Sequence, residues 1–405
     1  MSTSITSGST FTTQLKPSSF ADKALKGSVW FWYAVAVLGQ WAFVFYIVAV
    51  YGHSTFTGNF QAWNKNPIFR MGYVAGDTLG NVAFGMHALL AAVITFGGGI
   101  QLIPQIRARA ISVHRWIGRA VVVSLLGLSF SGLYMKTLRG ARGSKIEAAS
   151  TILNALLIIA FALLAWRAAR SHEIPTHRRW ALRTYLVANA QWFRQVGVLA
   201  WIIVNHGPVG ITDDFEGPFM YFWDFGSYLL PLLVLELYLR TQESPGPRRR
   251  LAMSGALIVL TLLMALGAIG TARAFYIPIA KTVNDPRTSI ADTMSATIDS
   301  SGIDEAAKQY YSLKATQPTV YNFDEPELEK LGYKFIKAKK FKEALRLFQL
   351  NVEAYPKSSN AYDSLGEAYM GTSDKATAIL NYQKSIQLDP RNTHPGKMLK
   401  KINTP

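Results

Sequence analysis

The stretch RARAISVHRWIGR, residues 107–119, decides the fold, because its pattern returns further along the chain as RSHEIPTHRRWALR, residues 170–183. A constant offset of 63 relates Arg107, Ile111, His114 and Arg115 to Arg170, Ile174, His177 and Arg178. A tryptophan and an arginine follow in each copy, with one residue inserted in the second. Each copy opens a long apolar segment. The sequence therefore predicts a duplicated helical hairpin over residues 78–136 and 149–206.

Apolar residues are gathered in uninterrupted blocks before about residue 281. The run from Gly27 to Tyr51 predicts an anchor helix, since no small-residue cleavage site follows it. Further spans are expected at roughly 78–103, 115–136, 149–168, 179–206, 219–240 and 251–279, each near the length of about 20 residues that crosses a bilayer. The predicted fold class is all-α. A mobile tail over residues 1–27 precedes a polytopic membrane bundle of about seven transmembrane helices over residues 28–281.

Most of the formal net charge of +17 comes from the hydrophobic part of the chain, before about residue 281. Residues 1–281 hold 25 of the 42 Lys and Arg residues, but only 10 of the 25 Asp and Glu residues. Positive charge between apolar helices is what membrane topology requires, so the basic composition does not predict nucleic-acid binding. The chain has no cysteine, which excludes disulfides, thiolate ligands and catalytic thiols. The isolated histidines outside the repeats stand at no metal-ligand spacing, and no metal site is expected.

The charges between the spans predict the orientation. Basic clusters at 107–115, 167–179 and 248–250 alternate correctly as cytoplasmic loops. Asp213, Asp214 and Glu216 lie in a segment without Lys or Arg, as expected outside. One loop opposes this pattern, because it should also be external and yet carries Lys136, Arg139, Arg142 and Lys145. Most of the loops therefore predict that the amino terminus lies in the cytoplasm and the carboxyl terminus outside the plasma (inner) membrane of a bacterium.

After Lys281 the composition becomes that of a soluble helical domain, and a repeat with an offset of 34 begins. It relates Leu331-Gly332, Phe335, Ala344, Phe348 and Pro356 to Leu365-Gly366, Tyr369, Ala378, Tyr382 and Pro390. These positions resemble the tetratricopeptide repeat. The resemblance implies a tetratricopeptide domain over residues 321–405, preceded by a linker and capping helix over 282–320. It also implies a protein partner that docks on this tail or a spacing role.

Parallel repeats related by an axis along the membrane normal would place His114 and His177 opposite one another at one depth. Neutral imidazoles that face across a four-helix bundle hold haem iron in membrane cytochromes, and Arg115 and Arg178 would lie near the propionates. Haem b is therefore a candidate cofactor. The alternative is anchoring in the membrane interface, which needs no cofactor. Since Ser150 stands at the position equivalent to His87, at most one haem is expected.

Arg194 lies well inside a predicted span, where an unpaired charge costs about 3 kcal/mol or more. Gln191 and Gln195 share its face by helical spacing. The rise along the helices places His87 at a similar depth, so these four residues are predicted to line one outward-opening cavity. Such a cavity suits an anionic headgroup, a quinone carbonyl or a proton relay. The alternative is a structural arginine paired with Asp77, Asp224 or backbone carbonyls.

Residues 80–205 resemble a family of bacterial predicted membrane proteins classed as a domain of unknown function, at the His-Arg segments and the helices between them. The resemblance implies a multi-pass bundle set in membrane lipid and names no chemistry. No Ser-His-Asp or paired-carboxylate arrangement stands in the membrane segments, so no enzymatic reaction is predicted. The leading hypothesis is a haem- or quinone-linked membrane redox protein with a protein-docking tail. The alternatives are a small-anion carrier or sensor, and a membrane-anchored scaffold that acts through its repeats.

Overall fold

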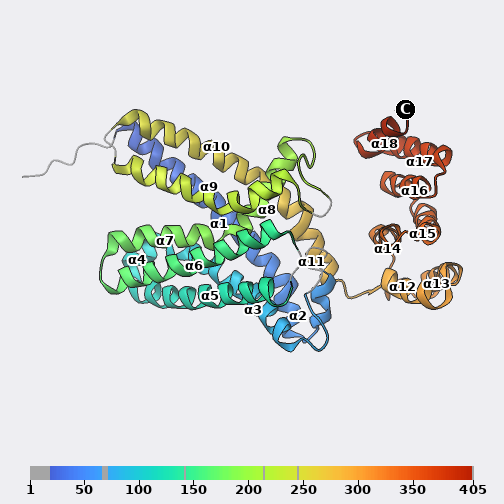
Figure 1. Ribbon diagram of the computed structural model, residues 1–405, viewed down its shortest axis with the longest axis horizontal. Helices are drawn as coiled ribbons and strands as arrows, with labels where there is room; N and C mark the ends of the chain where they lie inside the picture. The colour runs from blue at the N-terminus through green and yellow to red at the C-terminus, as the bar shows by residue number, and fades with distance from the viewer. Residues whose placement is uncertain (1–18, 66–71, 141–142, 213–214, 244–245, 404–405) are drawn as a thin grey trace, which may run out of the picture. The chain divides into compact units, whose positions relative to one another are not determined.

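The computed structural model describes residues 19–65, 72–140, 143–212, 215–243 and 246–403. The described chain is almost entirely helical, which confirms the predicted all-α fold (Figure 1). It divides into two compact units, one up to Asn284 and one from Asp285 onward. Asp213, Asp214 and Arg142, which entered the topology prediction, lie outside the described residues.

The first unit is a bundle of long apolar helices. Six described segments are long and apolar enough to cross a membrane, namely 20–56, 78–101, 111–137, 145–170, 218–243 and 247–283. The chain is therefore a multi-pass membrane protein. In order, the elements are α1 (Phe20–Ile47), η1 (Val48–Gly52), α2 (His53–Phe56), η2 (Phe60–Lys65), α3 (Thr78–Gln101), α4 (Pro104–Arg109), α5 (Ile111–Thr137), α6 (Lys145–Arg170), α7 (Ile174–Ala188), α8 (Ala190–Val204), α9 (Pro218–Glu243), α10 (Pro247–Thr271), η3 (Ala272–Tyr276) and α11 (Ile277–Val283).

The first helix begins before the apolar run, so part of the predicted tail is helical. The Ser19 side chain accepts from the Asp22 backbone N–H, and the Asp22 carboxylate accepts from the Ser19 backbone N–H. This capping box satisfies two N–H groups that the helix itself leaves free, and α1 starts at Phe20. Residues 1–18 lie outside the described part of the chain.

The predicted span over residues 179–206 consists of two helices. Only Asn189 separates α7 from α8, and each has 15 residues, too few to cross a bilayer alone. Together they run antiparallel to the whole of α9, because Arg183 pairs with Glu236 near one end and Trp201 stacks on Phe219 at the other. Since α9 is itself long enough to cross, this geometry supports a seventh crossing made by one broken helix.

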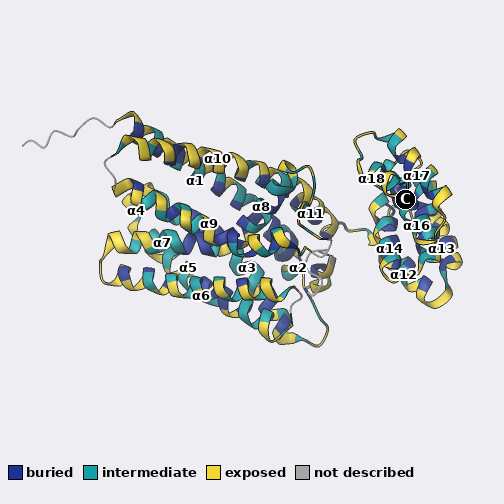
Figure 2. Ribbon diagram, turned by 45° about the horizontal axis from the view of Figure 1, so that its top comes forward, coloured by how far each residue is buried: buried dark blue, intermediate teal, exposed yellow. Residues whose placement is uncertain are grey.

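The duplicated hairpins pack as a group of four helices. Helix α3 packs on α5, α5 on α6, α6 on α7 and α7 on α3, so α5 and α7 are diagonal to each other. Apolar side chains from all four helices fill the interior, among them Ile94, Leu125, Ile158 and Val187. Beside this group, α1 packs along α10, and α8 packs against α9 and α10. Buried positions face the helix contacts, and exposed positions lie on the outer faces (Figure 2).

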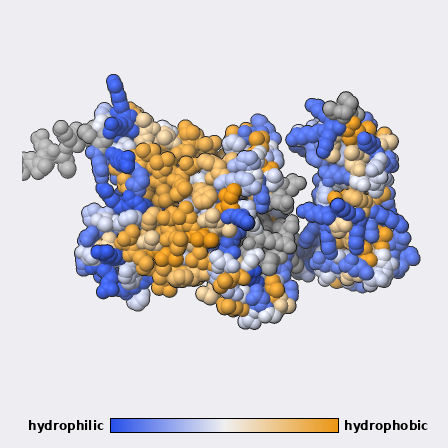
Figure 3. Space-filling view, viewed as in Figure 1, coloured by the Kyte–Doolittle hydropathy of each residue, from blue (hydrophilic) through white to orange (hydrophobic). Residues whose placement is uncertain are grey.

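The surface of the first unit carries an apolar belt. On the face drawn in Figure 3, a hydrophobic band lies across the middle of the unit and is bounded by hydrophilic side chains at the end that holds α4 and the turn between α6 and α7. Ion pairs bring the ends of other helices to the same end of the unit. Arg250 at the start of α10 contacts Asp22 in the first turn of α1. In the same way, Arg179 at the start of α7 contacts Glu243 at the end of α9. The basic loops therefore share one end of the bundle.

The second unit has a core of its own and consists mainly of short helices. Its elements are β1 (Thr288–Ser289), α12 (Ile290–Ser301), α13 (Ile303–Thr316), β2 (Tyr321–Asn322), α14 (Glu325–Lys337), α15 (Phe341–Ala354), α16 (Ser359–Gly371), α17 (Lys375–Leu388) and α18 (His394–Asn403). Strands β1 and β2 form a parallel pair. The bounds of α14 and α15 recur in α16 and α17 at the 34-residue offset found in the sequence.

Two glycines explain why these helix pairs pack closely. A Cβ on Gly332 would lie 2.6 Å from the Phe348 ring, and one on Gly366 would lie 2.7 Å from the Tyr382 ring. Both rings are fully buried, as are Ala344 and Ala378. Each glycine therefore makes room for the aromatic side chain of the following helix at the same repeat position.

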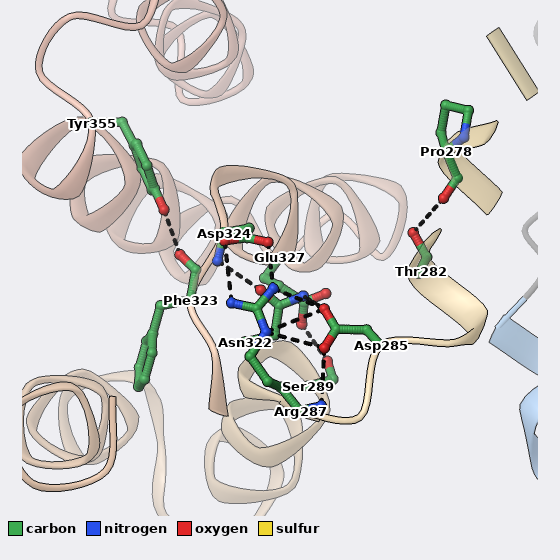
Figure 4. Close-up of polar contacts among 10 residues, drawn as sticks. All are labelled: Pro278, Thr282, Asp285, Arg287, Ser289, Asn322, Phe323, Asp324, Glu327 and Tyr355. Carbon is green, nitrogen blue, oxygen red and sulfur yellow. Dashed lines mark hydrogen bonds and ion pairs between the residues drawn. The ribbon is translucent and has the colours of Figure 1, made fainter. Parts of the chain in front are cut away.

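Arg287 ties the first residues of the second unit to the start of α14 (Figure 4). Its Nη2 donates to Asp285 at 2.8 Å and to Asp324 at 2.7 Å. Asn322 also donates to Asp285, at 3.2 Å. Hydrogen bonds to the two carboxylates raise the pKa of the Arg287 guanidinium above its ordinary value, and Asp285 has the larger effect. This cluster holds the segment before β1 against β2 and the α14 amino terminus.

Candidate functional site

The two copies of the duplicated signature have the same local structure. Ile111 and Ile174 are the first residues of α5 and α7, so His114 and His177 both occupy the fourth helical position. The guanidinium of Arg119 lies 5.0 Å from the Trp116 ring centre, and that of Arg183 lies 4.7 Å from the Trp180 ring centre. Each copy therefore forms the same cation–π contact one turn after its histidine.

His114 and His177 lie near the basic end of diagonal helices. The His177 Nδ1 is 2.9 Å from the Ala165 carbonyl of α6, an arrangement that leaves Nε2 for another partner. Between α6 and α7, however, the rings of Phe161 and Trp180 pack together with their centres 5.3 Å apart. On the α3–α5 side, a Cβ on Gly97 would lie 3.0 Å from Val121.

Both hairpins are therefore closely packed next to the two histidines, and a haem between them would displace these side chains. Arg115 and Arg178, proposed for the propionates, are exposed. Haem ligation stays a prediction.

Arg194 has one of the partners that the sequence offered. Its Nε donates to Oδ1 of Asp224 in α9 at 2.8 Å, and the Asp224 side chain is only 4% exposed. Asp77 is engaged elsewhere, because it caps α3 and accepts from Arg139. Trp223 fixes the neighbourhood, since its ring lies where a Cβ on Gly197 would be and its Nε1 donates to the Arg194 carbonyl at 3.1 Å.

The other predicted members of the Arg194 site point elsewhere. Gln195 accepts from the Tyr276 hydroxyl of η3 at 2.6 Å, while Gln191 is exposed. The His87 Nδ1 lies 3.1 Å from the Leu128 carbonyl and 3.2 Å from the Ser131 hydroxyl, both in α5. Among the described residues, no hydrogen bond or ion pair links His87 to Arg194. The packing of α8 between α9 and α10 separates side chains that share one helical face in the sequence.

Arg194 retains free hydrogen-bonding capacity. Its side chain is 23% exposed, and within the described chain no hydrogen bond is recorded for its two terminal nitrogens. Asp224 lies six residues after Pro218, at which α9 begins, so the pair is about 9 Å from that end of the helix. Arg194, with only its Nε hydrogen-bonded to Asp224, therefore lies in the half of the bundle opposite the basic loops.

The break at Asn189 gathers buried polar groups that the sequence prediction did not include. The Tyr185 hydroxyl donates to Gln40 Oε1 at 2.6 Å, and Asn189 Nδ2 donates to the Tyr185 carbonyl at 2.8 Å. Gln40 Nε2, Asn189 Oδ1 and Trp192 Nε1 have no hydrogen-bond partner in the described chain. The signal for this cluster in the sequence is a lone glutamine within an apolar run, Gln40 between residues 27 and 51.

Residues 84–213 match the family described as Predicted membrane protein (DUF2306). The match confirms the resemblance expected for this region. The DUF2306 region begins within α3, contains α4 to α8, and ends in the segment before α9. It includes His87, His114, His177 and Arg194, whereas Asp224 lies beyond it. No curated protein and no solved structure matches the chain.

Proposed function

We propose that the membrane unit is a carrier or sensor that binds a small carboxylate- or carbonyl-bearing molecule at Arg194. The observation that carries this proposal is the Arg194–Asp224 pair itself, in which Asp224 uses only one nitrogen of an accessible guanidinium. A planar guanidinium fork matches a pair of ligand oxygens. In an apolar surrounding, N–H groups without acceptors are costly, so an oxygen-bearing ligand would be stabilised there.

The broken helix supports the same proposal. Arg194 lies five residues after Asn189, on the short helix α8, while Gln195 joins the π-helical turn η3 through Tyr276. Breaks and π-helical turns in membrane helices are frequent next to binding sites. Because Asp224 already neutralises Arg194, the site favours a neutral acceptor or a single negative charge over a multiply charged anion.

The test measures ligand-induced thermal stabilisation of the detergent-purified protein with acetate and acetamide, and with succinate as the multiply charged comparison. Since Arg194→Gln alone leaves Asp224 buried and unpaired, the informative variant is Arg194→Gln with Asp224→Asn, which removes both charges. The matched control is Arg183→Gln with Glu236→Gln, which removes an ion pair between α7 and α9 near the opposite end of α9. We expect at least one ligand to stabilise the wild type and the control but not the Arg194 variant. If none stabilises the wild type, or all three proteins respond alike, the proposal is wrong.

A haem- or quinone-linked redox role is a second candidate. One observation favours it, namely that the Ala165 carbonyl contacts Nδ1 of His177, as backbone carbonyls do at histidines that bind a metal through Nε2. Bound haem would supply one-electron chemistry, with His114 and His177 as iron ligands. A Soret band that shifts on reduction and vanishes in His114→Ala and His177→Ala would support it. A colourless protein after expression with added haem precursor would exclude haem ligation.

A scaffold role is the third candidate, with the second unit as a tetratricopeptide domain that docks a protein. The 34-residue recurrence of helix bounds supports it. So does an open cavity of about 690 Å³ lined by side chains that include Asp363, Arg391 and His394. The piece 285–405 should then be soluble and retain a specific protein partner. We also propose that this domain lies outside the plasma membrane of a bacterium and the amino terminus inside.

A further inference from the structure

The two cation–π pairs of the duplicated signature differ in their surroundings. In the second copy, Arg183 Nε donates to Glu236 at 2.7 Å, and Trp180 packs on Phe161. That pair is satisfied within the protein. In the first copy, Trp116 is 68% exposed and Arg119 is exposed as well. No ion pair of Arg115 or Arg119 is recorded in the described part of the chain, so these guanidinium groups face outward with their charge uncompensated.

These exposed groups lie where the basic end meets the apolar belt. Trp116 and Arg119 are the sixth and ninth residues of α5, which places them about 8 to 12 Å along the helix from its start. Arg115 and Arg119 are four residues apart and therefore neighbours on one face. Indole rings favour this depth, at the boundary between headgroups and acyl chains.

The same face of α5 continues as an apolar stripe. Val123 and Phe130 follow Trp116 at intervals of seven residues and are 70% and 61% exposed. A seven-residue spacing keeps side chains on nearly the same side of a helix. A guanidinium pair above a continuous apolar stripe matches a phospholipid, whose phosphate lies directly above its acyl chains.

We propose that Arg115, Trp116 and Arg119 bind the phosphate of an anionic phospholipid whose acyl chain lies along Val123 and Phe130. The stacking of Arg119 on Trp116 orients the guanidinium before the lipid arrives. Two uncompensated positive charges favour a lipid with net negative charge over a zwitterionic one. The second copy does not form such a site, because Arg183, the counterpart of Arg119, is already paired with Glu236.

The test counts lipids bound to the detergent-purified full-length protein by native mass spectrometry, with phosphatidylglycerol compared with phosphatidylcholine. The Arg115→Gln/Arg119→Gln variant should bind phosphatidylglycerol roughly ten- to thirtyfold more weakly, since each basic group near a lipid headgroup contributes measurably to the affinity. The matched control is Arg167→Gln/Arg170→Gln, which removes two exposed charges at the same end without touching the tryptophan. Trp116→Leu, which keeps every charge, should weaken binding by a few fold.

Each arm of this experiment supports or overturns the proposal. Retained affinity in the control, with loss in Arg115→Gln/Arg119→Gln, supports it. Equal loss in both variants would mean that only the total charge of the basic end matters. Equal retention of phosphatidylcholine by the wild type would remove the preference for anionic lipid. Competition by soluble glycerol 3-phosphate would assign the site to a free phosphate compound instead.

Discussion

Arg139, two residues beyond the end of α5, donates a 2.8 Å hydrogen bond from Nε to Oδ2 of Asp77, the residue that caps α3. Its side chain is only 7% exposed. Lys136 is likewise paired with Glu147. These ion pairs engage two of the four basic residues that oppose the topology prediction, Lys136 and Arg139. Arg142 lies outside the described residues, so the side on which this loop lies stays a prediction.

The orientation can be tested by cysteine labelling, since the chain has no cysteine of its own. Single cysteines would replace Ser171 between α6 and α7, Val209 between α8 and α9, and Ser301 at the end of α12. An impermeant maleimide on intact cells should label Val209→Cys and Ser301→Cys. Ser171→Cys should react only after the membrane is disrupted, because basic loops are retained inside.

Two outcomes of this experiment would contradict the topology in different ways. Labelling of Ser171→Cys alone in intact cells would invert the whole orientation. Protection of both Ser171→Cys and Val209→Cys, or labelling of both, would mean that α7 and α8 do not cross the membrane together.

The Arg194–Asp224 pair predicts an asymmetric effect of substitutions on stability. Arg194→Gln should lower the free energy of unfolding by about 3–5 kcal/mol, because it leaves a buried carboxylate without its partner. Adding Asp224→Asn should restore much of that loss, since no unpaired charge remains. Denaturant titration of the detergent-purified variants measures both values. Equal losses in the single and the double variant would show that the pair does not act as a charge pair.

The sequence predicted the parts of the fold that depend on local repetition. The 63-residue offset placed His114 and His177 at the same helical position, and the 34-residue offset predicted the repeat that relates α14 and α15 to α16 and α17. It could not choose the partner of Arg194, because helical spacing relates residues of one helix and Asp224 belongs to another. It also missed the break at Asn189, since one asparagine in a long apolar run is compatible with an uninterrupted helix.

Glu329 gives the second unit a pH dependence. Burial raises the pKa of its carboxyl above the ordinary value of 4.5, and the nearby Glu325, Glu367 and Asp363 raise it further. A carboxyl whose pKa is higher in the folded state binds protons more tightly there, so stability falls as pH rises through that range. Urea unfolding of the fragment 285–405 should therefore show Glu329→Gln gaining stability relative to the wild type as the pH rises above the ordinary pKa of 4.5.

The control for this comparison is Glu305→Gln, which removes an exposed carboxylate from α13. It should leave the pH profile of unfolding close to that of the wild type. Parallel profiles for Glu329→Gln and the wild type would show that the pKa of the partly buried Glu329 carboxyl is not raised by folding.

The close helix pairs of the second unit predict a cost for adding single methyl groups. Gly332→Ala and Gly366→Ala should each destabilise the fragment 285–405 by about 1–3 kcal/mol, because the new Cβ would overlap the ring of Phe348 or Tyr382. Gly396→Ala is the matched control, since a Cβ there meets no atom within 4 Å. Alanine favours a helix over glycine by about 1 kcal/mol, so the control should be neutral or more stable. Urea unfolding monitored by circular dichroism measures all three, and a gain in stability for Gly332→Ala equal to that of the control would rule out the close contact between α14 and α15.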